Sequence, residues 1–433
     1  MEKAYLVGWA SSRRPVVAGR ISDAEELLQE LHELATSAGA QVVGFILQRS
    51  PRPDPATLVG RGKVVEVHTA ARAAGAGVII FDHDLTPSQL RNLEQALGVK
   101  VIDRTQLILD IFARRARTRE GKLQVELAQL NYLLPRLAGK GTLLSRLGGG
   151  IGTRGPGEQQ LEFDRRRLRS RIAKLGQAID RVRSQRALHR ARRRQQRFLT
   201  VSLVGYTNAG KSTLFNALTR ASVATSSRLF ATLDPTVRAL KLESGRPVLL
   251  SDTVGFIRKT PPHLVAAFRA TLEELAEADL ILHVTDASDP RHSDQDAAVE
   301  GMLESLGVGA TPRLHAWNKI DLLQPAELKR LNFGSNDEAK DSAPAAVSAL
   351  TGEGLESLLH LIDRNLAEDP VIEAQFVLSA ADGEGLAMLH RSASVLSTDF
   401  EDNRVFVRAL VRTSVRNRLQ MLTQQGEKAP AER

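Results

Sequence analysis

The strongest constraint on the fold is a run in which an apolar strand, a glycine-containing loop and a helix follow one another directly. This run is FLTVSLVGYTNAGKSTLFNAL, residues 198–218. Its loop fits the pattern GxxxxGK[ST], in which backbone N–H groups at a helix N-terminus surround a phosphate group. A strand that enters such a loop belongs to a doubly wound α/β sheet. The predicted phosphate-binding residues are Gly205, Tyr206, Thr207, Asn208, Ala209, Gly210, Lys211 and Ser212.

Side chains in and after this loop have specific predicted roles. Lys211 reaches the β- and γ-phosphate oxygens, and the Ser212 hydroxyl binds Mg²⁺. In the motif SDTVGF, Asp252 holds Mg²⁺ through a water, and the Gly255 N–H meets the γ-phosphate. Between these motifs, LFATLDPT supplies Thr232 as a further Mg²⁺ ligand, with Thr236 as the alternative. Lys211, Thr232 and Gly255 are therefore the predicted catalytic residues. The motifs LFATLDPT and SDTVGF add further predicted nucleotide contacts, which are Phe230, Ala231, Thr232, Leu233, Asp234, Asp252, Thr253, Val254 and Gly255.

Two later motifs predict which base is bound. In WNKID, Asp321 offers two carboxylate oxygens to the N1–H and 2-amino donors of guanine, a donor pair that adenine lacks. In VSAL, a backbone N–H is expected to meet the guanine O6. The predicted base contacts are Asn318, Lys319, Ile320, Asp321, Ser348, Ala349 and Leu350. Together the motifs predict an enzyme that hydrolyses GTP to GDP with Mg²⁺.

Two positions affect the predicted rate of hydrolysis. Many GTPases carry a glutamine after DxxG that orients the attacking water, but here the position is Phe256, which cannot bond to water. We therefore expect slow intrinsic hydrolysis. In related GTPases, an asparagine at the position of Asn208 helps to hold a K⁺ ion, so stimulation of hydrolysis by K⁺ is a further hypothesis.

The positive charge of the chain is concentrated in one segment. Residues Arg165–Arg197 contain fourteen Lys or Arg and one acid, a local charge of +13, whereas the whole chain carries +9. Such a segment favours a polyanionic partner, nucleic acid first. The chain has no cysteine, which excludes disulfides and thiolate zinc sites and fits the cytoplasm. No apolar run is long enough to span a membrane, and we expect a monomer.

The pattern of apolar residues predicts four parts and a multidomain α/β fold. Residues 1–104 form an α/β domain with strands at Tyr5–Ala10, Val42–Leu47, Val78–Asp82 and Val99–Asp103, and 198–369 form the phosphate-loop GTPase domain. Residues 370–433 form a small α/β domain with a helix at Gly385–Leu396 and a disordered end. The part between the first two, residues 105–197, reads as a basic antiparallel helical hairpin.

The hairpin prediction rests on two apolar stripes. Leu123, Leu127, Leu130 and Leu134 form one, and the other is a heptad seam formed by Leu161, Leu168, Ile172, Leu175, Ile179 and Val182. GGGIGTRGPGEQQLE, residues 148–162, would lie at the tip, and its glycines would let the backbone approach RNA closely. The residues predicted to contact RNA are Lys140, Arg146, Gly152, Arg154 and Gly155 at the tip, and Arg165, Arg166, Arg167 and Arg169 on the stem.

The motifs GYTNAGKST, FATLDPT, DTVGFI and NKID, preceded by the glycine-rich loop and a basic helix, resemble the HflX family of GTPases. This resemblance implies binding to the large ribosomal subunit and its rRNA, and GTP-dependent splitting or rescue of stalled ribosomes under stress. It also suggests that some members use ATP through the N-terminal domain, where the turn around Lys63 is a candidate. Two alternatives stay open: a nucleotide-switched regulatory GTPase that acts on a membrane or protein partner, and an RNA-modifying GTPase.

Overall fold

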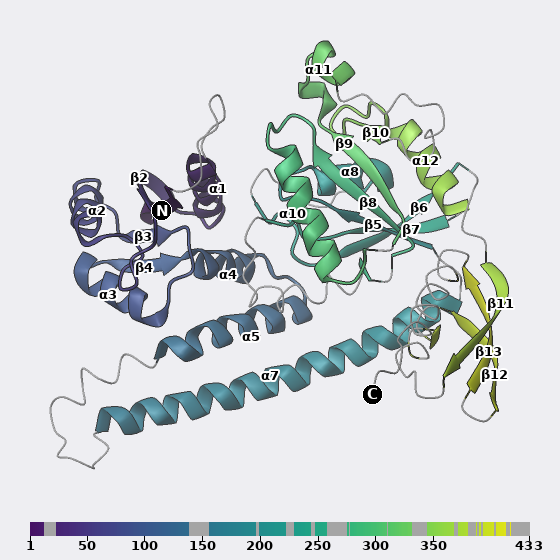
Figure 1. Cartoon of the computed structure of the whole chain (residues 1–433), viewed down its shortest axis with the longest axis horizontal. Helices are drawn as coiled ribbons and strands as arrows, with labels where there is room; N and C mark the ends of the chain where they lie inside the picture. Colours follow the sequence, from purple (N-terminus) through teal and green to yellow (C-terminus); the bar gives the residue numbers. More distant parts are fainter. Residues whose placement is uncertain are drawn as a thin grey trace, which may run out of the picture.

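The computed structural model describes residues 1–12, 23–137, 156–195, 199–221, 229–243, 247–257, 275–276, 278–309, 311–330, 344–367, 371–379, 387, 389–390, 393–401, 404–412 and 416. The predicted tip residues Lys140, Arg146, Gly152, Arg154 and Gly155 lie outside these ranges, as does the end of the chain that was expected to be disordered. The described parts are a layered N-terminal part, two long helices, a central sheet and a small C-terminal sheet (Figure 1).

The N-terminal part is a four-stranded parallel sheet in the order β2-β1-β3-β4. Its elements are β1 (Lys3–Ser11), α1 (Asp23–Ser37), β2 (Gln41–Ser50), α2 (Arg61–Ala73), β3 (Val78–Phe81), α3 (Pro87–Leu97) and β4 (Lys100–Asp103). The four predicted strands are thus confirmed, with small differences at their ends. Strand β3 is buried along its whole length, as expected for the apolar run VIIF in a parallel sheet with both faces covered.

The glycine turn before α2 has a structural explanation. Gly60 caps the helix in an extended conformation. Lys63, the candidate for an ATP contact, lies in the first turn of α2, and its ammonium group is 2.6 Å from the Glu66 carboxylate. A tight turn into a helix therefore accounts for this segment.

Three helices, α4 (Arg104–Arg115), α5 (Arg119–Arg136) and α7 (Pro156–Gln195), connect the N-terminal part to the central sheet. Helices α5 and α7 lie side by side and run in opposite directions, as predicted for the stalk (Figure 1). An ion pair of 2.7 Å between Glu126 and Arg171 joins them. Among the described residues, no helix has both the length and the apolar sequence that a membrane crossing needs.

The burial of α5 differs from the simple hairpin prediction. Its leucine stripe is only half-buried, and the fully buried side chains Val125, Ala128 and Tyr132 lie on another face of the helix. These three join the hydrophobic core of the N-terminal part, so α5 packs on two sides. In α7, Leu175 and Ile179 of the predicted seam are buried.

The central domain is built on a six-stranded sheet in the order β10-β9-β8-β5-β7-β6, parallel except for β6, which runs antiparallel to β7. Its strands are β5 (Leu199–Val204), β6 (Thr236–Lys241), β7 (Pro247–Asp252), β8 (Leu280–Asp286), β9 (Arg313–Asn318) and β10 (Ala345–Ala346). The helices are α8 (Lys211–Thr219), α10 (His292–Ser305), the short 3-10 helix η2 (Ile320–Leu322), α11 (Pro325–Arg330) and α12 (Leu355–Ala367). This is the predicted doubly wound arrangement, in which the phosphate loop leaves the central strand β5.

The C-terminal part is an antiparallel sheet in the order β11-β13-β12. Its strands are β11 (Val371–Ser379), β12 (Ser394–Glu401) and β13 (Arg404–Arg412). The predicted helix at Gly385–Leu396 is wrong at its C-terminal end, because Ser394–Leu396 belong to β12. Pairing with β13 overrides the local helical pattern there, which is a common outcome for short apolar segments.

One hydrophobic core joins the N-terminal part to the central domain. It contains residues of α1 and α4 together with Tyr206, Phe230 and Phe256 of the central domain. The rings of Phe112 and Phe230 meet edge to face with their centroids 4.8 Å apart. The two parts are therefore packed against each other through the loops at the edge of the central sheet.

Candidate functional site

The phosphate loop connects β5 to α8, and Lys211 is the first residue of that helix. The Lys211 ammonium group is buried and donates to the carbonyl oxygens of Gly205, 3.0 Å away, and Tyr206, 2.6 Å away. Burial lowers the pKa of Lys211 to about 8, although the Asp252 carboxylate opposes this shift. The lysine therefore lies folded back along its own loop, at the helix N-terminus where phosphate groups bind.

Three predicted Mg²⁺-binding side chains come together beside this lysine. Ser212 Oγ is 2.7 Å from Asp252 Oδ2 and 2.8 Å from Thr232 Oγ1, and Thr232 Oγ1 is 3.0 Å from the same carboxylate oxygen. The three residues come from α8, from the segment before β6 and from the end of β7. The alternative, Thr236, is the first residue of β6 and pairs with Asp252 in the β6–β7 register.

The carboxylate of Asp252 is the most constrained member of this group. It is fully buried, and burial raises its pKa although the hydroxyls of Ser212 and Thr232 oppose the shift. Its second oxygen, Oδ1, is buried without a hydrogen-bond partner in the described residues. A buried carboxylate oxygen without such a partner is suited to a hydrogen-bond donor or a cation.

Gly255 and Phe256 lie against the phosphate loop. A side chain at Gly255 would come 2.8 Å from Thr207 Cα and 2.9 Å from Lys211 Nζ, so only glycine fits this position. The Phe256 N–H donates to Gly205 O (3.1 Å), and its carbonyl accepts from Thr207 N–H (2.8 Å). The Phe256 ring is buried in the shared core, so it packs and does not face a water molecule.

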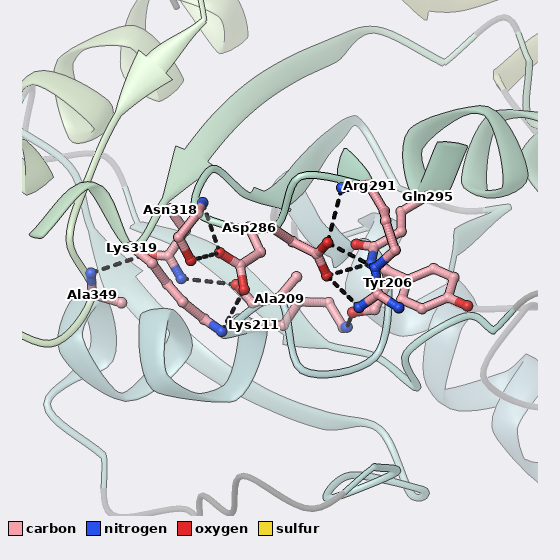
Figure 2. Close-up of polar contacts among 11 residues, drawn as sticks. Tyr206, Ala209, Lys211, Asp286, Arg291, Gln295, Asn318, Lys319 and Ala349 are labelled. Carbon is pink, nitrogen blue, oxygen red and sulfur yellow. Dashed lines mark hydrogen bonds and ion pairs between the residues drawn. The ribbon is translucent and has the colours of Figure 1, made fainter. Parts of the chain in front are cut away.

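Three of the predicted base contacts, Asn318, Lys319 and Ala349, lie close to the phosphate loop (Figure 2). Asn318 donates through Nδ2 to Ala209 O (2.8 Å) and accepts from Ala349 N–H (3.0 Å), which ties two loops to the phosphate loop. Lys319 Nζ is 2.6 Å from Asp286 Oδ2. In a neighbouring contact, the Ser348 hydroxyl donates to Asp321 Oδ1 (2.6 Å). Because each carboxylate oxygen can accept two hydrogen bonds, both Asp321 oxygens can still accept from a base.

The remaining predicted contacts have varied environments. Asn208 is exposed and has a left-handed backbone (φ 66°). The Thr207 hydroxyl is buried without a partner among the described residues, whereas the Thr253 hydroxyl donates to Leu203 O (2.5 Å). Val254 and Ile320 are buried, Ala231 is half-buried, and Leu350 is 80% exposed.

Comparison with known proteins gives matches along most of the chain. The family models described as GTP-binding GTPase N-terminal, GTP-binding GTPase Middle Region and 50S ribosome-binding GTPase match residues 25–113, 115–193 and 200–319. The GTPase HflX of Caldanaerobacter subterraneus is 45% identical over 96% of this chain and 93% of its own length. That of Escherichia coli is 48% identical over 83% of both chains. The chain belongs to the HflX family of GTPases.

Solved structures similar to this HflX-family chain include a GTP-binding protein from the archaeon Sulfolobus solfataricus in complex with GDP. It is 24% identical and covers 85% of this chain and 99% of its own, with a TM-score of 0.43.

In this HflX-family chain, part of the predicted nucleotide segment contacts the N-terminal part. We call residues 229–235, which lie before β6, the Thr232 segment. The Asp234 carboxylate accepts from the N–H groups of Arg117 and Thr118, both at 2.8 Å, and from the Thr118 hydroxyl. Phe230 and Leu233 are buried in the shared core. Asp234 is therefore engaged at the N-terminus of α5, and its assignment to the nucleotide stays a prediction.

The sequence did not predict several other contacts between the central domain and the N-terminal part. The Tyr206 hydroxyl donates to Glu30 Oε2 (3.0 Å), and Glu30 pairs with the buried Arg104, which also binds Asp82 at 2.8 Å. The Leu229 N–H donates to Ser37 Oγ (3.0 Å). Glu30, Ser37, Asp82 and Arg104 belong to no motif, and Tyr206 and Leu229 are distant from them in the chain. The only available signal was Arg104 itself, a cation that directly follows the apolar strand β4.

The four predicted stem arginines lie on the N-terminal half of α7. Arg166, Arg167 and Arg169 are exposed, and Arg165 is half-buried. Arg166 Nε is 3.3 Å from Glu162 one turn earlier. This surface is basic and follows directly after the glycine-rich segment in the sequence.

Proposed function

We propose that this GTPase binds the large ribosomal subunit through rRNA and uses Mg²⁺-dependent GTP hydrolysis to split or rescue stalled and idle ribosomes under stress. The observation that carries this proposal is the double engagement of the Thr232 segment. Thr232 bonds to the predicted Mg²⁺ ligands, and Asp234, two residues later, bonds to Thr118 at the start of the basic stalk. A change in nucleotide state would therefore act on the base of the RNA-binding element.

The residues around Asp252 fit a bound Mg²⁺. They offer oxygen donors, which this ion prefers, and Asp252 Oδ1 has no hydrogen-bond partner among the described residues, so it can accept from a water bound to the ion. Ser212 and Thr232 would hold the ion directly and Asp252 through a water. When bound, Mg²⁺ supplies positive charge to the β- and γ-phosphate oxygens.

The chain's own residues would do the rest of the work at the phosphates. Lys211 would exchange its two carbonyl partners for phosphate oxygens, a change that its position on the loop permits. The Gly255 N–H would meet the γ-phosphate. Because Phe256 packs in the core, water orientation has to come from elsewhere, so we propose slow intrinsic hydrolysis that a bound ribosome accelerates.

We further propose that K⁺ stimulates hydrolysis through Asn208. This side chain is exposed at the phosphate loop, where a monovalent cation could supply the charge that an arginine provides in other GTPases. Hydrolysis rates in K⁺ and in Na⁺ at equal ionic strength test this point. Equal rates would remove K⁺ from the mechanism.

The basic helix supports rRNA as the partner. A 40-residue helix extends about 60 Å, and α7 together with the next two residues carries the +13 segment. Aromatic residues form only 4% of the chain, so phosphate contacts are favoured over base stacking. Each phosphate neutralised should contribute a slope of about 0.7–0.9 to the dependence of log affinity on log salt.

Sedimentation with purified ribosomal subunits tests the proposal. We expect association with the large subunit in the presence of a non-hydrolysable GTP analogue and much weaker association with GDP. Replacing Arg166, Arg167 and Arg169 by alanine should lower the salt slope by roughly two to three. The matched control is Arg238→Ala, which removes an exposed arginine from the edge strand β6.

Two results would redirect the interpretation. Absence of ribosome association in both nucleotide states would refute the proposal and return attention to a regulatory GTPase with a protein or membrane partner. Substitutions at Gly152–Gly155 should abolish activity on ribosomes while GTP binding stays intact. Loss of GTP affinity in those variants would assign the glycine-rich loop to the nucleotide site.

A further inference from the structure

A second group of metal-binding side chains lies on the central sheet, outside the nucleotide site. Strands β8 and β9 are parallel neighbours, and their register places His283 opposite His315. Side chains directly opposite on paired strands point to the same face. Helix α10 packs against β8 and contributes Asp296 and Glu300, which are one helical turn apart and therefore face the same way (Figure 1).

The donor atoms are close enough to share one ion. Those of His283, Asp296 and His315 all lie within 4.8 Å of one another. His283 Nε2 is 3.2 Å from Asp296 Oδ1, and His315 Nε2 is 3.8 Å from Asp296 Oδ2. In a tetrahedral site with bonds of about 2.0–2.2 Å, ligand atoms are roughly 3.4 Å apart. Shifts of about 1 Å in the partly exposed Asp296 and His315 would close the site.

His283 is oriented as metal-binding histidines are. Its side chain is 6% exposed, and its Nε2 is buried without a hydrogen bond of suitable geometry, although Asp296 is near. Its other ring nitrogen, Nδ1, is 3.4 Å from Glu300 Oε1, and Glu300 is in turn paired with Arg313. A carboxylate on one ring nitrogen fixes the proton there and leaves the lone pair of the other nitrogen free for a metal.

The other two donors can reach the forms that a metal requires, with a change of tautomer at His315. Burial, with a contribution from nearby His283, lowers the pKa of His315 to about 4, so its imidazole is neutral at neutral pH. Burial alone would raise the pKa of Asp296, but the side chains of His283 and Thr285 bring it below its usual value. The Thr285 hydroxyl donates to Asp296 Oδ1 (2.5 Å) and therefore accepts from His315 Nε2–H (2.7 Å), which keeps these groups together. Metal binding through Nε2 would move the His315 proton to Nδ1.

We propose that His283, His315 and Asp296 bind one divalent transition-metal ion of the zinc class, with Glu300 as the supporting carboxylate. Two imidazoles and one carboxylate select such an ion, whereas Mg²⁺ prefers oxygen ligands throughout. Three protein donors leave a fourth position for water. Asp286 and Asn318 end the same two strands, so the ion would brace the base-binding edge from the α10 face.

Calorimetric titration of the full chain with Zn²⁺, in saturating Mg²⁺ and GDP, tests the site. We expect one Zn²⁺ per chain. His315→Gln and Asp296→Asn should weaken its binding at least tenfold, and Glu300→Gln should weaken it about tenfold. The matched control is His292→Gln at the start of α10, because the His292 ring contacts Trp317 and is not among the proposed ligands. This variant should leave the Zn²⁺ affinity within twofold of the wild type.

A second measurement avoids dependence on the variants. Co²⁺ bound at this site in the wild-type chain should give the visible absorption bands of a low-coordinate nitrogen-ligated ion, and Zn²⁺ should abolish them. Absence of Zn²⁺ uptake by the wild-type chain, or wild-type affinity in both His315→Gln and Asp296→Asn, would overturn the proposal. Unchanged GDP affinity in the variants verifies that they are folded.

Discussion

The contact between Asp234 and the start of α5 leads to a quantitative prediction. Asp234→Ala removes the acceptor of two N–H donors and one hydroxyl donor at a helix N-terminus. The side chains are partly exposed, so water replaces part of the lost bonding. From the usual values for a cap and for a charged acceptor, the contact contributes about 1–2 kcal/mol. The equilibrium constant for local opening of the backbone at Arg117 and Thr118 should therefore rise about 5- to 30-fold.

Hydrogen exchange measures this change directly. The amides of Arg117 and Thr118 should exchange about 5- to 30-fold faster in Asp234→Ala, because both donate to the lost carboxylate. GDP affinity should stay within twofold of the wild type. The matched pair Thr118→Val and Thr118→Ser separates the hydroxyl bond from packing, and only the valine variant should raise exchange. Unchanged exchange together with a tenfold loss of GDP affinity would refute this reasoning and assign Asp234 to the nucleotide.

Three further predictions follow from buried contacts. Gly255→Ala should lower GTP affinity at least tenfold in a fluorescent-nucleotide titration, because its methyl group meets Lys211, and unchanged affinity would contradict the close approach. Asp321→Asn should weaken GTP binding and favour xanthosine triphosphate, whose 2-oxo group accepts a hydrogen bond from an amide; an unchanged preference in competition assays would exclude base contact. Arg104→Met should destabilise the N-terminal part by about 3–5 kcal/mol, because it removes the guanidinium group that compensates the buried carboxylates of Glu30 and Asp82. Hydrogen exchange of the β3 and β4 amides should become faster, and a wild-type exchange pattern would contradict this role.

The central site could be predicted because its residues follow strands. Four of the five motifs stand at the carboxyl ends of the parallel strands β5, β7, β9 and β10, and the topology of the sheet brings such ends together without further information. Ser212, Thr232 and Asp252 were expected to share one ion, and they lie within hydrogen-bond distance of one another. The rule for α/β sheets accounts for Ser212 and Asp252, whereas Thr232 lies before β6 and was predicted from its motif alone.

The contacts between domains could not be predicted in this way. Tyr206 and Glu30 are 176 residues apart, and nothing in the local pattern of either indicates the other. The same limit applies to α5, where the leucine stripe suggested one apolar face and the buried Val125 and Tyr132 define another. Because α5 packs on two sides at once, its apolar residues do not form the single stripe of helical spacing that sequence analysis detects. The helix expected at Gly385–Leu396 was wrong at its end for a related reason, since strand pairing decided the conformation.

The length of α7 gives the chain a mechanical property. The helix ends at Gln195, and the strand that carries the phosphate loop begins at Leu199. Because α5 packs along α7, the two helices would move together, and a rotation of about 10° at that end of a helix of about 60 Å would carry the opposite end through about 10 Å. The small rearrangements that accompany loss of a γ-phosphate would then be amplified into a displacement about as wide as an α-helix.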